Sequence, residues 1–248
     1  MNARHALHSP GLRRGLAATA VGAAAWSWWA LDSAPYPYAQ RRLLDLPLPF
    51  LTQQRLESLL ELRPGQRVLE IGPGTGLQSL RIAPRLGPGG RLDIVDIQQE
   101  MLDHVMLRAG RLGIDTIVPT CADAHALPFP DEVFDAAYLV TALGEIPDPK
   151  VALAELRRVV HPEGRVVVGE FFDRHQIRRS TLAHRANAAG MHVTRLLGPP
   201  FAYYALLRPC GSTHEGSPPE ATETPAASFP ALEAFSGRGV GTPSGAPG

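Results

Sequence analysis

A glycine-rich loop follows a short apolar run at residues 68–79, which read Val-Leu-Glu-Ile-Gly-Pro-Gly-Thr-Gly-Leu-Gln-Ser. Gly72 and Gly74 allow the backbone to turn tightly and to approach a ligand closely, because glycine has no Cβ atom. The free amides of a helix that starts after the loop would add hydrogen-bond donors beside it. The dinucleotide pattern G-x-G-x-x-G would need a glycine where the chain has Leu77, which argues against an NAD-linked oxidoreductase.

Acidic residues stand at the ends of the next apolar runs. Asp96 ends the run at residues 91–96, about 20 residues past the glycines, where doubly wound nucleotide folds hold ribose hydroxyls with a carboxylate. A carboxylate can accept two hydroxyl donors at once. Asp123 follows a third apolar run. Either acid alone is better explained by a helix cap or a solvated loop, but their order at strand ends predicts a ligand site.

Candidates for proton transfer come after the fourth and fifth apolar runs, at residues 134–140 and 164–172. Glu145 follows the fourth, and Glu170, Asp173 and His175 lie at or after the end of the fifth. In open α/β sheets ligands bind beyond the carboxyl ends of the strands, which favours Glu145 as the catalytic residue. A capping or surface role just before Ile146 and Pro147 is the alternative interpretation of Glu145.

Helix and strand patterns alternate along the elements that would position these residues. We expect helices from a Thr52 cap to about Leu62, at 77–86, at 98–112, at 149–160 before a turn at 161–164, and at 181–189 after a Ser180 cap. Strands at 191–197 and 202–207 are joined by Gly-Pro-Pro, a link so short that the two must pair antiparallel. The fold class predicted is α/β, with a doubly wound, mostly parallel sheet and an antiparallel C-terminal hairpin.

The pattern Glu70-x-Gly72-x-Gly74-x-Gly76 resembles the first motif of the class I S-adenosylmethionine (SAM)-dependent methyltransferases. Further matching stretches lie at 95–102, 126–129 and 153–164, and they are similar to the small-molecule branch, both ubiquinone/menaquinone C-methyltransferase-like and phospholipid N-methyltransferase-like enzymes. The resemblance implies SAM as cofactor and a seven-stranded Rossmann-like sheet. It also implies a set of cofactor-binding residues, namely Glu70, Gly72, Gly74, Gly76, Asp96, Ile97, Asp123 and Ala124, with Asp96 at the ribose and Asp123 at the adenine amino group.

Two features of relatives are missing after the fourth strand, and they bear on the catalytic residues and on the substrate. Many relatives have a histidine just after this strand, whereas this chain has Thr141 to Glu145, so a role for that histidine cannot be transferred. The Pro-Pro-Tyr and Pro-Cys elements of nucleic-acid base methyltransferases are also missing there. We therefore expect methyl transfer by in-line displacement to a small, apolar acceptor. The alternatives are methylation of a membrane lipid or quinone, and a SAM-binding module without transferase activity.

Composition bounds the remaining function classes. The chain has 248 residues, 44% of them hydrophobic, and a formal net charge of zero, so no net charge draws it to nucleic acid. Its two cysteines, Cys121 and Cys210, do not suggest a disulfide, and no Cys/His spacing resembles a metal site. The oligomeric state is not indicated by the sequence.

Three zones are expected along the chain. Residues 1–31 contain arginines followed by an apolar, Trp-rich stretch at 15–31, and residues 32–208 form the methyltransferase domain. Residues 209–248 have a Pro/Gly/Ser/Ala-rich composition that predicts disorder. Residues 15–31 fit peripheral membrane contact, a terminus that is poorly ordered or covers the core, or an export signal. Because SAM is a cytosolic metabolite, we expect a cytoplasmic protein, at the inner face of the membrane if residues 15–31 contact it.

Overall fold

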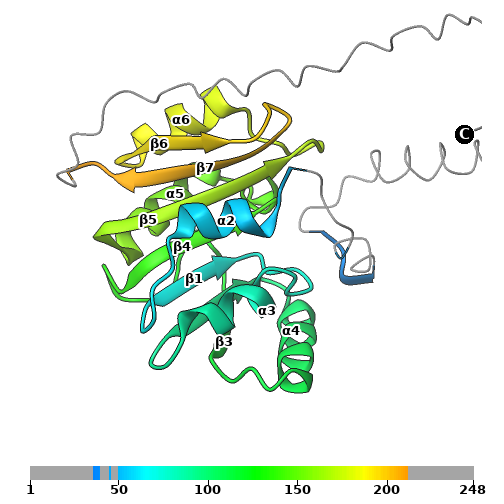
Figure 1. Ribbon diagram of the computed structural model, residues 1–248. Coiled ribbons are helices and arrows are strands. Elements are labelled where there is room, and N and C mark those ends of the chain that lie inside the picture. Colours follow the sequence, from blue (N-terminus) through cyan, green and yellow to red (C-terminus); the bar gives the residue numbers. More distant parts are fainter. Residues whose placement is uncertain (1–35, 40–44, 46–49, 212–248) are drawn as a thin grey trace, which may run out of the picture. The chain divides into compact units, whose positions relative to one another are not determined.

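The computed structural model describes residues 36–39, 45 and 50–211, so the predictions for residues 1–31 and for nearly all of the tail lie outside the described residues. Seven strands and the intervening helices alternate along this part of the chain (Figure 1). The strands are β1 Arg67–Ile71, β2 Arg91–Asp96, β3 Ile117–Cys121, β4 Phe134–Val140, β5 Val160–Phe171, β6 Met191–Leu197 and β7 Ala202–Pro209. The helices are α2 Gln53–Leu60, α3 Ser79–Ile82, α4 Gln99–Arg111, α5 Pro149–Val159 and α6 Arg179–Ala188, with short 3₁₀ turns η3 Ala83–Leu86 and η4 Leu143–Glu145.

The strands form one sheet in the order β3-β2-β1-β4-β5-β7-β6. Strands β1 to β5 pair in parallel, while β7 pairs antiparallel with both β5 and β6. The predicted fold class is therefore confirmed, including the C-terminal hairpin. The chain runs outward from β1 to β3 and then returns to the other side of β1 as β4. This reversal places a crevice at the carboxyl ends of β1 and β4, the usual ligand position in doubly wound sheets.

Helices cover both faces of the sheet, and each face has its own hydrophobic core. One core contains residues of α2, α3 and α4, and the other contains residues of α5 and α6. Figure 1 shows α2 lying across the first of these faces. Strand β5 serves both cores, because Val166 and Val168 point to one face and Val167 to the other.

Several predicted helix boundaries are confirmed and others are wrong. Thr52 caps α2 by accepting the backbone N–H of Arg55 at 3.4 Å. Helix α3 begins at Ser79 rather than at residue 77, and Pro84 stands where the chain tightens into η3. Ser180 does not cap α6, which begins at Arg179 without a side-chain cap. Helix α4 spans Gln99–Arg111, one residue shorter at each end than the predicted 98–112, and Leu112 after it is 64% exposed.

The predicted turn at residues 161–164 is also wrong, since these residues belong to β5. Phe134 of β4 pairs with Val160, whereas Ala136 pairs with Arg165. The pairing register shifts between these two pairs, so the extra residues of β5 are absorbed as an irregularity within the strand.

One buried carboxylate holds the amino-terminal ends of β1 and β2. Asp93 has no exposed side-chain surface, and Arg67 Nε donates to its Oδ2 at 2.8 Å. Arg91 Nη2 donates to its Oδ1 at 2.6 Å. The ion pair of Arg67 ties β1 to β2 at the end opposite the crevice, whereas that of Arg91 lies within β2.

We predict that Asp93→Ala lowers the free energy of unfolding by about 1.5–3 kcal/mol, the range for hydrogen bonds to charged groups. The loss stays within this range because both arginines are partly exposed and regain water. Urea unfolding measures the effect, with the exposed Asp115→Ala as the matched control. A variant as stable as the control would contradict this role for Asp93.

Candidate functional site

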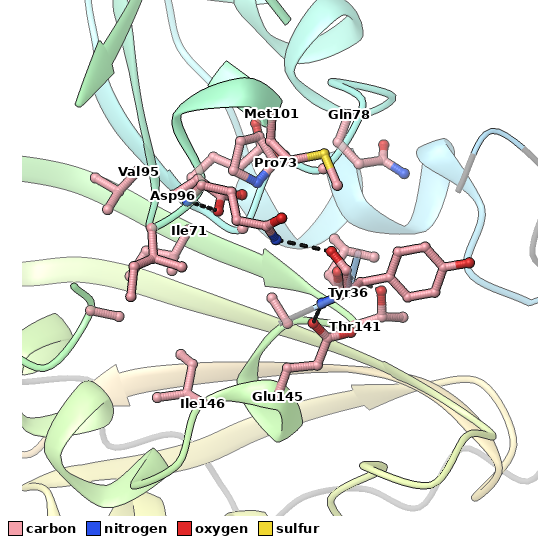
Figure 2. A pocket seen from close by; sticks show the side chains of 18 of the residues that line it. Tyr36, Ile71, Pro73, Gln78, Val95, Asp96, Met101, Thr141, Glu145 and Ile146 are labelled. Carbon is pink, nitrogen blue, oxygen red and sulfur yellow. Dashed lines mark hydrogen bonds between the residues drawn. The ribbon is translucent and has the colours of Figure 1, made fainter. Parts of the chain in front are cut away.

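A pocket of about 340 Å³ lies at the carboxyl ends of the central strands. It is lined by the loop after β1, the ends of β2 and β3, the segment after β4 and two residues at the end of β5 (Figure 2). Tyr36 and Leu51 line it from the N-terminal part of the chain. The pocket therefore occupies the crevice that the reversal of strand order creates.

The glycine loop packs closely against its neighbours. Gly72, Gly74 and Gly76 all have positive φ angles, of 68°, 53° and 82°, which are unfavourable for other residues. A Cβ atom on Gly72 would lie 2.6 Å from the Cβ of Ala142. One on Gly76 would lie 2.9 Å from Cγ1 of Val105 in α4. Gly72 and Gly74 line the pocket, whereas the room beside Gly76 is taken up by α4.

Glu70 is the next-to-last residue of β1, just before this loop, and is 3% exposed. The hydroxyl of Ser79, the first residue of α3, donates to its Oε2. Burial raises the pKa of Glu70 to about 7, and the nearby charge of Asp96 acts in the same direction. Glu70 thus links β1 to α3 and holds a carboxyl at the floor of the pocket.

Asp96 stands at the end of β2 and points along the pocket wall (Figure 2). The backbone N–H of Gln98 donates to its Oδ1 at 2.9 Å, which orients the carboxylate. Burial raises the pKa of Asp96 above its usual range. Ile97, which follows, also lines the pocket and is 58% exposed.

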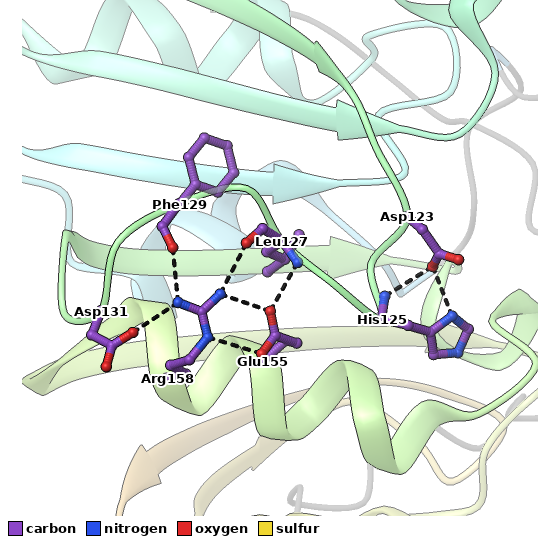
Figure 3. Close-up of polar contacts among 7 residues, drawn as sticks. All are labelled: Asp123, His125, Leu127, Phe129, Asp131, Glu155 and Arg158. Atoms are coloured by element: carbon purple, nitrogen blue, oxygen red, sulfur yellow. Dashed lines mark hydrogen bonds and ion pairs between the residues drawn. The ribbon is translucent and has the colours of Figure 1, made fainter.

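Asp123 lies on the loop after β3 and is oriented by a histidine that sequence reasoning missed. Its Oδ1 accepts the backbone N–H of His125 at 2.9 Å and lies 2.7 Å from the ring Nδ1 (Figure 3). These contacts lower the pKa of Asp123. The other ring nitrogen accepts the backbone N–H of Asp148, the residue that caps α5, at 3.2 Å. Ala124 between them is buried and lines the pocket.

Arg158 secures the chain that continues from this loop (Figure 3). Its guanidinium donates to the carboxylates of Glu155 and Asp131 and to the backbone carbonyls of Leu127 and Phe129. Glu155 in turn accepts the backbone N–H of Leu127 at 2.8 Å. The loop that carries Asp123 is therefore fixed to α5 at both ends.

Glu145 lines the pocket and holds a distant part of the chain. Its Oε2 accepts the backbone N–H of Tyr36 at 3.0 Å, while Gln98 Nε2 donates to the carbonyl of Tyr36 at 2.9 Å (Figure 2). Tyr36 thereby bridges the segments that follow β2 and β4. Burial raises the pKa of Glu145 to about 7, helped by the charges of Asp173 and Asp96.

A second contact ties the same N-terminal segment to the glycine loop. Oδ1 of Asp45 accepts the hydroxyl of Thr75 at 2.8 Å and Nη1 of Arg108 at 3.0 Å. The same nitrogen of Arg108 donates to the Thr75 carbonyl at 2.8 Å. Tyr36 and Asp45 are thus both attached to segments that line the pocket, although they lie far from these segments in the sequence.

Of the candidates for proton transfer at the end of β5, Asp173 lies in the pocket and Glu170 is buried outside it. Asp173 lines the pocket and accepts the backbone N–H of His175 at 2.7 Å. Glu170 is 2% exposed, lies outside the pocket lining, and accepts the backbone N–H of Ile177 at 3.1 Å. Burial raises the pKa of Glu170 to about 8.

The pocket carries a strong excess of acidic groups. Its described lining includes five carboxyl side chains and one histidine, but no lysine or arginine; the carboxyls belong to Glu70, Asp96, Asp123, Glu145 and Asp173. Such a lining favours a cation and opposes a phosphate-bearing ligand. Within the described residues no group of three or more His, Cys, Asp or Glu side chains could hold a metal ion.

Comparison with known proteins shows what the central part of the chain is similar to. Residues 69–168, from β1 into β5, match the family Methyltransf_11, a methyltransferase domain. The chain is 42% identical over 109 residues to the ubiquinone/menaquinone biosynthesis C-methyltransferase UbiE of Cupriavidus taiwanensis, a match that covers 44% of this chain and 44% of the relative. The chain therefore spans under half the length of this relative.

Solved structures share the fold of this matched region and of the elements that flank it. A SAM-dependent methyltransferase from Aquifex aeolicus superimposes with a TM-score of 0.64 at 20% identity, over 69% of this chain and 97% of its own. The [4+2]-cyclase SpnF superimposes with a TM-score of 0.57 at 19% identity, over 73% and 86%. The predicted resemblance to class I small-molecule methyltransferases is confirmed, and the solved structures share the predicted fold.

We predict that Gly76→Ala destabilises the domain by more than backbone strain alone, because its Cβ would press on Val105. Gly113→Ala is the matched control, since Gly113 also has positive φ, of 68°, but nothing lies within 4 Å of its added Cβ. The control should cost about 1–2 kcal/mol, and Gly76→Ala more. Urea unfolding measures both losses. When each glycine variant is combined with Val105→Ala, the difference between their losses of stability should become smaller. Equal losses for the two glycine variants would contradict the packing role of Gly76.

We predict that Glu145→Ala weakens binding of S-adenosylhomocysteine by about 0.5–1.5 kcal/mol, because Tyr36 loses one of its hydrogen bonds. Glu145→Gln should bind nearly as well as the wild type, since an amide oxygen can accept the same N–H. Isothermal titration measures both affinities. If Glu145→Ala binds like the wild type, Tyr36 does not help to form the binding site.

Proposed function

We propose that this protein transfers a methyl group from SAM to a small, apolar acceptor by in-line displacement. The observation that carries the proposal is the pocket lined by five carboxyl side chains and by no basic side chain among its described residues. SAM supplies an activated methyl group on a sulfonium, which is a cation. A dinucleotide would instead bring a pyrophosphate into this acidic lining, and Leu77 breaks the dinucleotide pattern as well.

The residues proposed to hold the cofactor fit this assignment. Glu70, Gly72 and Gly74 would lie beside its methionine part, with Gly76 shaping the loop. Asp96 would accept the ribose hydroxyls from the end of β2 with Ile97 beside it. Asp123 and Ala124 would meet the adenine. His125 acts as a positioning residue for Asp123.

Catalysis by this chain would consist mainly of placing the acceptor and excluding water, which can supply about 7–11 kcal/mol of the barrier. Tyr36 crosses the pocket rim and contributes to that enclosure. Glu145 is the proposed general base where the acceptor must lose a proton, because its pKa of about 7 suits proton uptake near neutral pH. Asp173 is the second carboxyl at this end of the pocket.

The pocket lining also includes apolar side chains. Leu51, Val140, Ile146 and Phe171 line the pocket, which supports an acceptor with a hydrophobic body. The relative from Cupriavidus taiwanensis is named for ubiquinone and menaquinone biosynthesis. A quinone precursor or a membrane lipid is therefore the finer proposal for the acceptor, and a cytoplasmic place of action follows from the cofactor.

A SAM-binding protein without methyl transfer is the second candidate function. The specific observation in its favour is that a [4+2]-cyclase has the same fold. A labelled-methyl screen against quinol and lipid extracts separates the two candidates. Incorporation of label supports transfer, whereas tight SAM binding with no incorporation into any extract favours the second candidate.

Binding of SAM, S-adenosylhomocysteine and NADH by isothermal titration tests the cofactor assignment. We predict that Asp96→Ala weakens binding of S-adenosylhomocysteine by about 1.5–3 kcal/mol, and that Asp96→Asn loses less because one acceptor oxygen remains. Asp115→Ala, an exposed acid on another loop, is the matched control and should bind like the wild type. Tight NADH binding, or wild-type affinity in both Asp96 variants, would contradict the assignment.

A further inference from the structure

Three exposed phenylalanines surround the end of β5 next to the pocket. Phe50, Phe172 and Phe201 are 42%, 62% and 47% exposed. Phe172 directly follows, and Phe201 directly precedes, the last paired residues of β5 and β7, Phe171 and Ala202. The rings of Phe50 and Phe201 meet edge to face, with their centroids 5.5 Å apart. We call these three residues the aromatic rim.

The aromatic rim adjoins the pocket through its neighbours in the chain. Leu51 follows Phe50, and Phe171 precedes Phe172; both Leu51 and Phe171 line the pocket. Phe50 has a positive φ of 72°, an unfavourable conformation for a residue with a large side chain. The end of β5 thus joins the pocket wall to an exposed apolar surface.

Basic side chains accompany the aromatic rim. Arg55 Nη1 donates to the carbonyl of Phe50 at 2.9 Å. The loop after β5 contributes Arg174 and Arg178, both exposed. The acid in this loop, Asp173, is half-buried and faces the pocket. The outer surface here is therefore locally cationic, although the pocket beside it is acidic and the whole chain has no net charge.

We infer that the aromatic rim docks on an anionic lipid bilayer. The inference rests on the proposed function, because a membrane-dissolved acceptor could then enter the pocket without crossing water. Adjacent exposed aromatic side chains mark interaction surfaces, and their combination with arginines fits the interface of anionic lipids. This surface is distinct from the Trp-rich residues 15–31. No helix among the described residues is long and apolar enough to span a membrane.

Flotation of the full chain with vesicles tests the inference. The vesicles are phosphatidylcholine with and without phosphatidylglycerol. Phe172→Ser combined with Phe201→Ser should lower partitioning onto the mixed vesicles by about tenfold or more. The loss of a single inserted side chain already accounts for this much. Leu107→Ser with Leu112→Ser is the matched control, because these leucines are 55% and 64% exposed on and after α4, which packs on β2 and β3. The control should partition like the wild type.

Charge variants supply the second arm. Arg174→Gln with Arg178→Gln should remove most of the preference for phosphatidylglycerol, whereas Arg111→Gln, at the end of α4, should retain it. Phe172→Ser alone provides a minimal variant, since Phe172 is the most exposed of the three residues. Thermal melting verifies that each variant is folded.

Several outcomes would overturn the inference. Wild-type protein that does not float, or a rim variant that floats like the wild type, would show that the aromatic rim does not contact lipid. A rim variant that loses self-association in sedimentation velocity, with vesicle binding unchanged, would assign the surface to a second copy of the chain. Binding of S-adenosylhomocysteine without vesicles should be unaffected in the rim variants. Its absence in the wild type would instead contradict the proposed function, whatever the vesicles show.

Discussion

The burial of carboxyl groups at the ends of the central strands, together with repulsion between neighbouring carboxyls, is the constraint on which the pocket depends. Glu70, Asp96, Glu145 and Asp173 all have pKa values raised by burial, and neighbouring carboxyls add to the effect at Glu70 and Glu145. The folded chain therefore retains protons that the unfolded chain would release. Stability contributed by these groups is present at low pH and is lost as pH rises from about 4.5 to about 7. A bound cation would offset this repulsion, which links the unfavourable electrostatics to function.

The rest of the structure holds these groups in place despite their repulsion. The ion pairs of Asp93 hold the amino-terminal ends of β1 and β2, opposite the pocket. Ser79 anchors Glu70, and His125 anchors Asp123. These contacts come from backbone amides, hydroxyls and a histidine rather than from basic side chains in the pocket. Glu70 and Asp123 are thus oriented by polar contacts rather than by lysine or arginine side chains.

Much of the fold could be predicted because apolar runs of strand length are bounded by polar turns. Residues 134–140 and 191–197 are strands with the expected limits, and the short Gly-Pro-Pro link required an antiparallel hairpin. Local patterns failed where tertiary contacts decide. His161 and Gly164 resemble a turn, but pairing with β4 draws them into β5. Most of the residues proposed to hold the cofactor could be expected near one another from their positions at strand ends, and they do line one pocket. The contact of Glu145 with Tyr36, however, spans 109 residues and leaves no local signal. The packing of Gly76 on Val105 is equally invisible in the sequence.

The pH dependence of two affinities tests the central claim, that an acidic pocket binds the sulfonium cofactor. SAM and S-adenosylhomocysteine differ by the charged methylsulfonium, while the rest of each molecule is the same. Isothermal titration from about pH 6 to about pH 8 spans the pKa values of Glu70 and Glu145. As both carboxyls ionise, the affinity for SAM relative to S-adenosylhomocysteine should rise severalfold with pH. A ratio that stays constant across this range, or the absence of binding by either molecule, would contradict the account.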